Sequence, residues 1–392
     1  MQAISNRASN IFSRAGLSKL GVFLGVLLIA PVALAFQYQP ALPGYTYHFP
    51  QDQAAHLDYK TEWWYYTGHL KTKTGHAYGY ELTFFRIGNQ PTGKENASPI
   101  NNQKNKTPWA TDQLYATHFA LSDEAKAQFH FSEKLNRAGL DVAGARTDVY
   151  YVWNELWQAQ GLANQMILQA DLPDGSVELH LLLSPEKPPV IHGQNGVSQK
   201  ADCVGCASHY YSYTRLKTEG FLIENGQAEP VQGLSWMDHE FGSNQLSSKQ
   251  VGWDWFSVQL NDGTELMLYL LRQKDGRIDP NSSGTWVDKA GHSRHLALKE
   301  FTVLSSGKTW KSATSQGIYP MNWQIKVPAL KLALQIHPAF ENQELFTKGS
   351  TGVAYWEGSA HVVGTRAGQT VEGQSYVEMT GYAKQAGVAG KL

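Results

Sequence analysis

The chain has 392 residues, enough for two domains that each bury a sizeable core. Its formal net charge is −1, with 33 Lys and Arg against 34 Asp and Glu, so no overall positive field would attract nucleic acid or an anionic membrane surface. Aromatic residues make up 12% of the chain, and so many large flat side chains suit β-sheet packing or a pocket for an extended apolar ligand.

The first 35 residues have the pattern of an export signal. Basic residues precede an apolar run over 20–34, and Ala33-Leu34-Ala35 places small residues at the two positions that a signal peptidase reads. A membrane anchor is the alternative, but this run contains Pro31 and is shorter than the ~20 residues needed to span a bilayer. We predict cleavage after Ala35, a periplasmic or secreted protein, and no membrane span in the mature chain.

Two aromatic hairpins resemble each other although they lie far apart in the sequence. The first runs through 62–70 and returns through 78–86, and the second runs through 253–260 and returns through 265–272. In each, an aromatic strand ends in Leu, a glycine permits the positive φ of a tight turn, and the returning apolar strand ends in Arg. The repeat predicts two related β-domains, because a long-period match constrains a fold more than a single motif does.

Strand signals separated by turn residues continue to the end of the chain. The segment 88–109 is rich in Asn, Lys, Pro and Gly, and we expect a loop inserted between strands there. A second break falls at 224–232, where Asn225-Gly226 and a proline interrupt the strand pattern. We therefore predict an all-β protein with a signal peptide over 1–35, an antiparallel β-domain over 36–228 and a second one over 229–392.

The sequence contains no Gly-x-Ser-x-Gly elbow, His-Glu-x-x-His helix, phosphate loop or dinucleotide fingerprint, so we expect no cofactor and no metal. The two cysteines, Cys203 and Cys206, admit three interpretations. Four-ligand zinc needs a second pair, and thioredoxin-like chemistry needs the motif at the start of a helix, whereas the segment 200–208 has the composition of a loop. In an exported protein the expected outcome is a small loop disulfide.

The densest polar cluster is Asp238-His239-Glu240. In an extended strand these side chains alternate, so His239 would face one way and both acids the other, which argues against a metal triad. A single imidazole with a carboxylate elsewhere can act as a general acid or base. The alternative is structural: Asp238 caps a turn and His239 is a hydrogen-bonded interface residue.

Three further polar residues, His118, Arg86 and Arg272, lie in apolar surroundings. They are candidates for a binding site. The alternative is that each pairs with a buried acid such as Glu62 or Asp254, since buried charges usually persist only when they are paired.

Motifs over most of the mature chain carry a family resemblance: Glu62-Trp63-Trp64-Tyr65, Thr117-His118-Phe119-Ala120, Ser235-Trp236-Met237-Asp238-His239-Glu240-Phe241-Gly242, Trp253-Asp254-Trp255-Phe256, Tyr355-Trp356-Glu357-Gly358 and Gly381-Tyr382. The chain resembles the AttH-like proteins, which group with acyclic-carotenoid 1,2-hydratase (hydroxyneurosporene synthase). The resemblance implies two lipocalin-like antiparallel β-barrels packed against each other.

The resemblance also implies a site. Asp238-His239 corresponds to a pair shared with the hydratases, and Phe241 corresponds to an aromatic residue two positions on. A tyrosine and an aspartate on a neighbouring strand complete the hydratase site. Here that strand supplies Tyr269 but has Leu271 in the expected place of the acid, and a displaced acid such as Asp254 or Glu265 would have to substitute.

Adding water to an isolated alkene needs an acid that protonates carbon, an apolar wall around the resulting cation and a base that activates water. Asp238 or Glu240 would be the acid, and His239 would orient it or accept a proton from water. The predicted catalytic residues are Asp238, His239, Glu240 and Tyr269. The predicted ligand-contacting residues are Trp63, Trp64, Tyr65, Arg86, His118, Trp236, Phe241, Trp253, Asp254, Trp255 and Arg272, with aromatic faces stabilising the cation.

Three functions remain open on the sequence. The first is an exported lipocalin-like protein that binds a long hydrophobic ligand, isoprenoid or acyl, with alkene hydration of the carotenoid 1,2-hydratase type, a hydro-lyase reaction. The second is a non-catalytic periplasmic carrier or accessory component of an ABC transport system, with transporter components as partners. The third is a structural role in the envelope, which needs neither a pocket nor a site.

Overall fold

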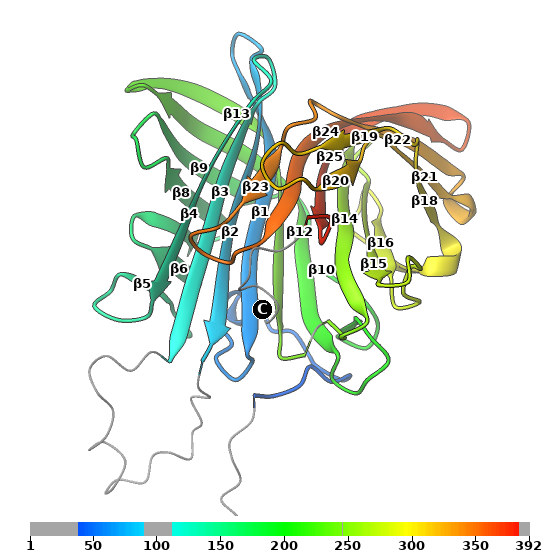
Figure 1. Ribbon diagram of the computed structural model, residues 1–392, viewed down its shortest axis with the longest axis horizontal. Coiled ribbons are helices and arrows are strands. Elements are labelled where there is room, and N and C mark those ends of the chain that lie inside the picture. Colours follow the sequence, from blue (N-terminus) through cyan, green and yellow to red (C-terminus); the bar gives the residue numbers. More distant parts are fainter. Residues whose placement is uncertain (1–37, 90–111, 245, 384–392) are drawn as a thin grey trace, which may run out of the picture. The chain divides into compact units, whose positions relative to one another are not determined.

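The computed structural model describes residues 38–89, 112–244 and 246–383, and the predicted signal peptide and most of the predicted loop at 88–109 lie outside them (Figure 1). Within these residues the regular elements are strands and the short 3-10 helices η1 (Gln51–Gln53), η3 (Leu298–Glu300) and η4 (Pro328–Leu330). No helix long and apolar enough to cross a membrane occurs in this described part of the chain. The prediction of an all-β protein is confirmed.

The first sheet has 13 antiparallel strands and curls into a nearly closed barrel (Figure 1). The strands are β1 (Thr61–Thr72), β2 (Ala77–Gly88), β3 (Gln113–Asp123), β4 (Gln128–Arg137), β5 (Ala143–Ala145), β6 (Tyr151–Asn154), β7 (Trp157–Leu162), β8 (Gln165–Asp171), β9 (Val177–Pro185), β10 (Val190–Ile191), β11 (Ser198–Gln199), β12 (Ala207–Glu224) and β13 (Gln227–Gly242). Their order is β4-β3-β2-β1-β13-β12-β9-β8-β7-β6-β5, and β10 and β11 pair with β12. Asn136 on β4 donates to Asn154 on β6 at 2.8 Å, which joins the two ends of the sheet.

The second sheet has ten strands and forms a half-barrel. Its strands are β14 (Gln250–Leu260), β15 (Glu265–Gln273), β16 (Ser283–Val287), β17 (Ser293–Ala297), β18 (Thr302–Ser305), β21 (Trp323–Val327), β22 (Leu332–Pro338), β23 (Glu344–Phe346), β24 (Ala354–Arg366) and β25 (Gln369–Thr380). The order is β17-β16-β15-β14-β25-β24-β22-β21-β18, with β23 beside β24. A separate pair consists of β19 (Thr309–Lys311) and β20 (Ile318–Pro320).

Each sheet encloses its own apolar core, and a third buried cluster joins the two sheets. The first sheet contributes Tyr65, Tyr210 and Trp236 to this joint cluster, and the second contributes Trp255, Met267, Tyr269, Leu271 and Tyr376. Large aromatic surfaces of this kind stabilise a contact between sheets because they bury much apolar area for each side chain. The fold is therefore a nearly closed barrel packed against a half-barrel, which agrees with the pair of lipocalin-like barrels that the resemblance implied.

Both predicted hairpins are present, as β1–β2 and β14–β15. The change of sheet, however, falls between Gly242 and Gln250 and not at 228/229. The break at Asn225-Gly226 is the turn of the β12–β13 hairpin, where both residues have positive φ. β13 then returns to pair with β1, so the strand that carries the polar cluster belongs to the first barrel.

Candidate functional site

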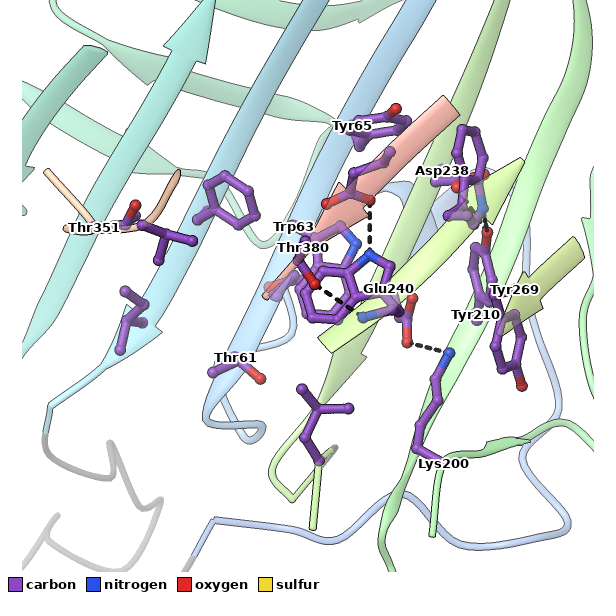
Figure 2. Close-up of a pocket in the computed structure, with 18 of the residues that line it drawn as sticks. Thr61, Trp63, Tyr65, Lys200, Tyr210, Asp238, Glu240, Tyr269, Thr351 and Thr380 are labelled. Atoms are coloured by element: carbon purple, nitrogen blue, oxygen red, sulfur yellow. Dashed lines mark hydrogen bonds and ion pairs between the residues drawn. The ribbon is translucent and has the colours of Figure 1, made fainter. Parts of the chain in front are cut away.

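A cavity of about 450 Å³ lies between the two sheets (Figure 2). Its lining comes from β1, β2, β3, β12 and β13 of the first sheet and from β14, β15, β24 and β25 of the second. Cavities of a few hundred Å³ with mostly apolar walls and a few polar groups are typical of small-molecule sites. The sheet-to-sheet contact thus contains a volume suited to a ligand.

The polar cluster on β13 divides as strand alternation predicts. Asp238 and Glu240 line the cavity, and the side chain of His239 points into the first barrel, where its Nε2 lies 2.8 Å from Oε1 of Glu62. The tyrosine Tyr211 contacts the other ring nitrogen of His239 at 2.9 Å. Because His239 is not part of the cavity wall, the Asp238–His239 pair cannot act together on one ligand atom.

Asp238 is a buried carboxyl held by three donors. Tyr210 donates to its Oδ2 and Trp236 to its Oδ1, both at 2.6 Å, and the Ser212 hydroxyl also donates to Oδ1. Burial raises the pKa of Asp238 to about 7, and these donors oppose the rise. A carboxyl with this pKa is present in both protonation states near neutral pH.

Glu240 is ion-paired with a residue that the sequence did not single out. The Lys200 ammonium lies 3.0 Å from Oε1 of Glu240, and Figure 2 shows this contact. The same ammonium lies 4.3 Å from the ring centroid of Tyr269 and 5.0 Å from that of Tyr210. Lys200 therefore occupies a cation site made of two aromatic rings and one carboxylate.

A disulfide joins Cys203 to Cys206 directly after Lys200. The backbone N–H of Lys200 donates to the carbonyl of Cys206 at 2.8 Å, which closes the loop against the start of β12. The Cys-x-x-Cys segment is thus a small loop disulfide whose position fixes the backbone from which Lys200 reaches the cavity.

A further acid of the cavity is Glu378 on β25, which the sequence did not reveal. It lies opposite Trp255 in the β14–β25 register, and Nε1 of Trp253 donates to its Oε2 at 2.9 Å. Burial raises the pKa of Glu378 to about 7, and the nearby carboxylates of Asp238 and Glu240 add to this rise. Glu378 is a single acid within the strand-like segment 376–382, and a single acid in one strand does not identify its neighbours across the sheet.

The expected substitutes for the missing acid lie elsewhere. Asp254 accepts from Arg272 at 3.0 Å, and Glu265 is paired with Lys187 and Arg215. Neither acid lines the cavity. Both acids form ion pairs outside the cavity wall. Glu378 is the acid that lines the cavity instead.

The remaining predicted residues separate into two groups. Trp63, Tyr65, His118, Trp253, Trp255 and Tyr269 line the cavity with Asp238 and Glu240. The residues Trp64, Trp236, His239, Phe241, Asp254 and Arg272 do not line it, and Arg86 borders it only as the buried partner of Glu62 at 2.8 Å. Arg86 and Arg272 are therefore each paired with a buried acid, Glu62 and Asp254 respectively, as the structural alternative predicts.

A possible metal-ligand set occurs inside the first barrel, and one of its members, Glu62, also borders the cavity. His56, Glu62 and His239 each offer one ligand atom, and these atoms lie within 4.8 Å of one another. However, the Arg86 guanidinium already lies on the same Glu62 carboxylate, and both histidines contact one oxygen of that carboxylate at 2.8 Å. A divalent ion would have to compete with the buried arginine charge, so the contacts fit a hydrogen-bonded network better than a metal centre.

Two more carboxyls, Glu81 and Glu357, are fully buried between the sheets. Burial holds the pKa of each well above its usual range, and Glu378 adds to the rise of both. Tyr65 donates to Oε1 of Glu357, and the Oε2 atoms of Glu81 and Glu357 have no hydrogen-bond partner among the described residues. Such groups are stable in a dry contact only when they are protonated.

Comparison with known proteins identifies the family of the chain. The AttH-like family model matches residues 40–382. The chain belongs to the AttH-like family. The crystal structure of a putative AttH from Nitrosomonas europaea is 33% identical over 88% of this chain and 100% of its own, with a TM-score of 0.78.

Two more distant structures share the fold. Kievitone hydratase from Nectria haematococca is 13% identical and covers 89% of this chain and 99% of its own, with a TM-score of 0.65. CghA in complex with Sch210972 is 11% identical over 89% of this chain and 97% of its own, with a TM-score of 0.51. Comparison with curated protein sequences gave no match.

Proposed function

We propose that this AttH-like protein binds a hydrophobic small molecule, isoprenoid or acyl, in the cavity between its barrels and adds water to an isolated alkene of that molecule. The observation that carries the proposal is the presence of two carboxyls, Asp238 and Glu378, in one aromatic cavity with pKa values of about 7. An acid and a base are both available there near neutral pH. The shared fold with a hydratase supports the reaction class.

The reaction would proceed in two steps. Protonated Asp238 gives its proton to one alkene carbon, so that the O–H bond breaks, a C–H bond forms and the other carbon becomes a cation. Ionised Glu378 then takes a proton from water as the water oxygen bonds to that cation. The alcohol leaves, and transfer of a proton from Glu378 to Asp238 through solvent restores the starting state.

The cavity walls suit such an intermediate. Trp63, Trp253 and Trp255 present aromatic rings, whose faces attract positive charge. Hydrogen bonds from Tyr210 and Trp236 fix the direction in which Asp238 points before the ligand arrives. In this proposal Tyr269 and Glu240 act on the ligand indirectly, because both hold the Lys200 ammonium.

A non-catalytic carrier in the periplasm, or an accessory component of an ABC transport system, is the second candidate. The observation in its favour is that Asp238 already accepts three hydrogen bonds, as a structural anchor would. The two candidates share the export that the N-terminal sequence predicts, and they differ in what the acids do.

The test begins with native mass spectrometry and lipid-extract analysis of mature protein purified from its own compartment. The compound that co-purifies is then offered to the wild type and to Asp238→Asn and Glu378→Gln. The hydratase proposal predicts that both variants bind the compound and lose turnover by at least about 100-fold. Binding without any turnover by the wild type would leave the carrier, and the absence of any ligand would contradict both.

A further inference from the structure

The corner of the cavity around Glu378 has the composition of a cation site. Trp255 lies opposite Glu378 in the sheet, and Trp253 donates to its carboxylate. Tyr65 reaches the same corner. It donates to Glu357, and Glu357 lies directly opposite Glu378 in the register of β24 and β25. Three aromatic side chains thus surround a carboxyl that is open to the cavity.

The same cavity already binds one positive charge by this chemistry. The Lys200 ammonium lies over the rings of Tyr210 and Tyr269 and is paired with Glu240. The Lys200 side chain thus shows how aromatic faces and one carboxylate in this cavity bind an ammonium group. It occupies the Glu240 side of the cavity and leaves the Glu378 side free for a ligand.

The charges of the lining favour a cation at that free side. Glu62 is neutralised by Arg86, and Glu240 is neutralised by Lys200. Asp238 and Glu378 have no ion-pair partner within 38–89, 112–244 and 246–383. Lys60, at the edge of β1, is the lining cation that remains. A ligand with a positive head would therefore find two carboxyls and a set of aromatic faces.

We propose that this corner is a subsite for an alkylated ammonium group at one end of an otherwise apolar ligand. The inference rests on the proposed ligand cavity, but it does not require the hydration reaction. Where hydration does occur, a trialkylammonium would imitate the positive carbon of the intermediate and would act as an inhibitor. The subsite therefore extends the ligand class from neutral hydrophobes to amphiphilic amines.

The experiment uses two probes of equal shape and different charge. N-phenyl-1-naphthylamine, a neutral fluorescent hydrophobe, first reports occupancy of the cavity in the mature protein. Benzyltrimethylammonium and its neutral isostere neopentylbenzene then compete for displacement of this dye. Both are compared in the wild type, in Glu378→Gln and in Glu372→Gln, a control that makes the same change at an exposed position of the same strand.

We expect the ammonium to displace the dye at about tenfold lower concentration than the neutral isostere, because cation–π attraction and a desolvated carboxylate add to an equal apolar contact. Glu378→Gln should reduce this preference to about twofold or less, and Glu372→Gln should keep it. Equal displacement by the two probes, or an unchanged preference in Glu378→Gln, would overturn the subsite while leaving the cavity in place. Failure of the dye itself to bind would instead contradict the proposed ligand cavity.

Discussion

At the level of single residues, the cavity depends on acids that keep their protons to higher pH than usual. Burial is the main cause for both Asp238 and Glu378, and each lies near other carboxylates that add to the effect. Placing two such acids in one aromatic cavity is costly for folding, because each must be dehydrated. A role in proton transfer gives a reason for the arrangement that packing alone does not.

The pH profile of turnover follows from these two acids. In the proposed reaction Asp238 acts as the protonated acid, so activity should fall as pH rises above about 7, and Glu378 acts as the ionised base, so activity should fall as pH drops below about 7. We expect kcat/KM for the co-purified ligand to give a narrow bell centred near pH 7, with apparent pKa values that belong to the pair. A profile that is flat between pH 5 and 9 would contradict the assigned roles.

Removal of metal should have no effect. The His56–Glu62–His239 group is already occupied by hydrogen bonds and by the Arg86 charge. We expect EDTA treatment to leave the Tm unchanged within about 1 °C, since no bound ion would be lost. A fall in Tm that zinc restores would show that these three residues hold a metal.

At the level of elements, the sequence predicts strands and hairpins better than it predicts their partners. The alternation of side chains along β13 could be predicted from the sequence. It correctly places His239 on the opposite face of the strand from Asp238 and Glu240. The Asn225-Gly226 turn was also recognised, but the sequence alone could not show whether it ends a domain or links two strands of one sheet. That choice depends on the pairing of β13 with β1, a contact between residues far apart in the chain.

For the same reason, only part of the candidate site could be predicted from the sequence. Residues in aromatic motifs, such as Trp63 and Trp255, were identified because local pattern marks them. Lys200 and Glu378 were missed because each is a single charge in an ordinary segment, and only the fold brings them to Asp238 and Glu240.

The disulfide loop should matter more for the ligand than for the fold. Closing so short a loop stabilises a protein by about 2 kcal/mol at most in the chain-entropy account. In the Cys203→Ser/Cys206→Ser variant we expect a small fall in Tm and a several-fold loss of ligand affinity. The reason is that the hydrogen bond from the Lys200 backbone N–H to the Cys206 carbonyl would weaken and Lys200 would be held less firmly at the cavity. The variant Lys200→Met serves as the reference for complete loss of the ammonium. Unchanged ligand affinity in the double variant would separate the loop from the cavity.

At the level of the whole molecule, the contact between the barrels contains buried acids on both sides. Burial holds the pKa values of Glu81 and Glu357 above their values in the unfolded chain. Their contribution to the free energy of unfolding is therefore greatest below the unfolded pKa and falls as pH rises toward the folded pKa. These two acids therefore stabilise the sheet contact most in mild acid. The sequence indicates two barrels, but it contains no local signal for how their faces match.

The variant Glu81→Gln should stabilise the protein. It keeps an acceptor for the Thr83 hydroxyl and removes the cost of ionising one of two neighbouring acids. We expect the free energy of unfolding to rise by about 1–3 kcal/mol at pH 8 and to change little at pH 4, since one pKa unit corresponds to about 1.4 kcal/mol. Denaturant unfolding at both pH values measures this, and equal effects at the two would argue that the acids are not protonated in the folded state.

We propose that the cavity between the barrels hydrates a bound alkene with Asp238 as the acid. The most direct test is incubation of the protein with its co-purified ligand in ¹⁸O-labelled water, followed by mass spectrometry of the ligand. We predict that the wild type adds one labelled water and that Asp238→Asn, although it binds the ligand, does not. Absence of label with the wild type, or equal labelling by Asp238→Asn, would contradict this role of Asp238.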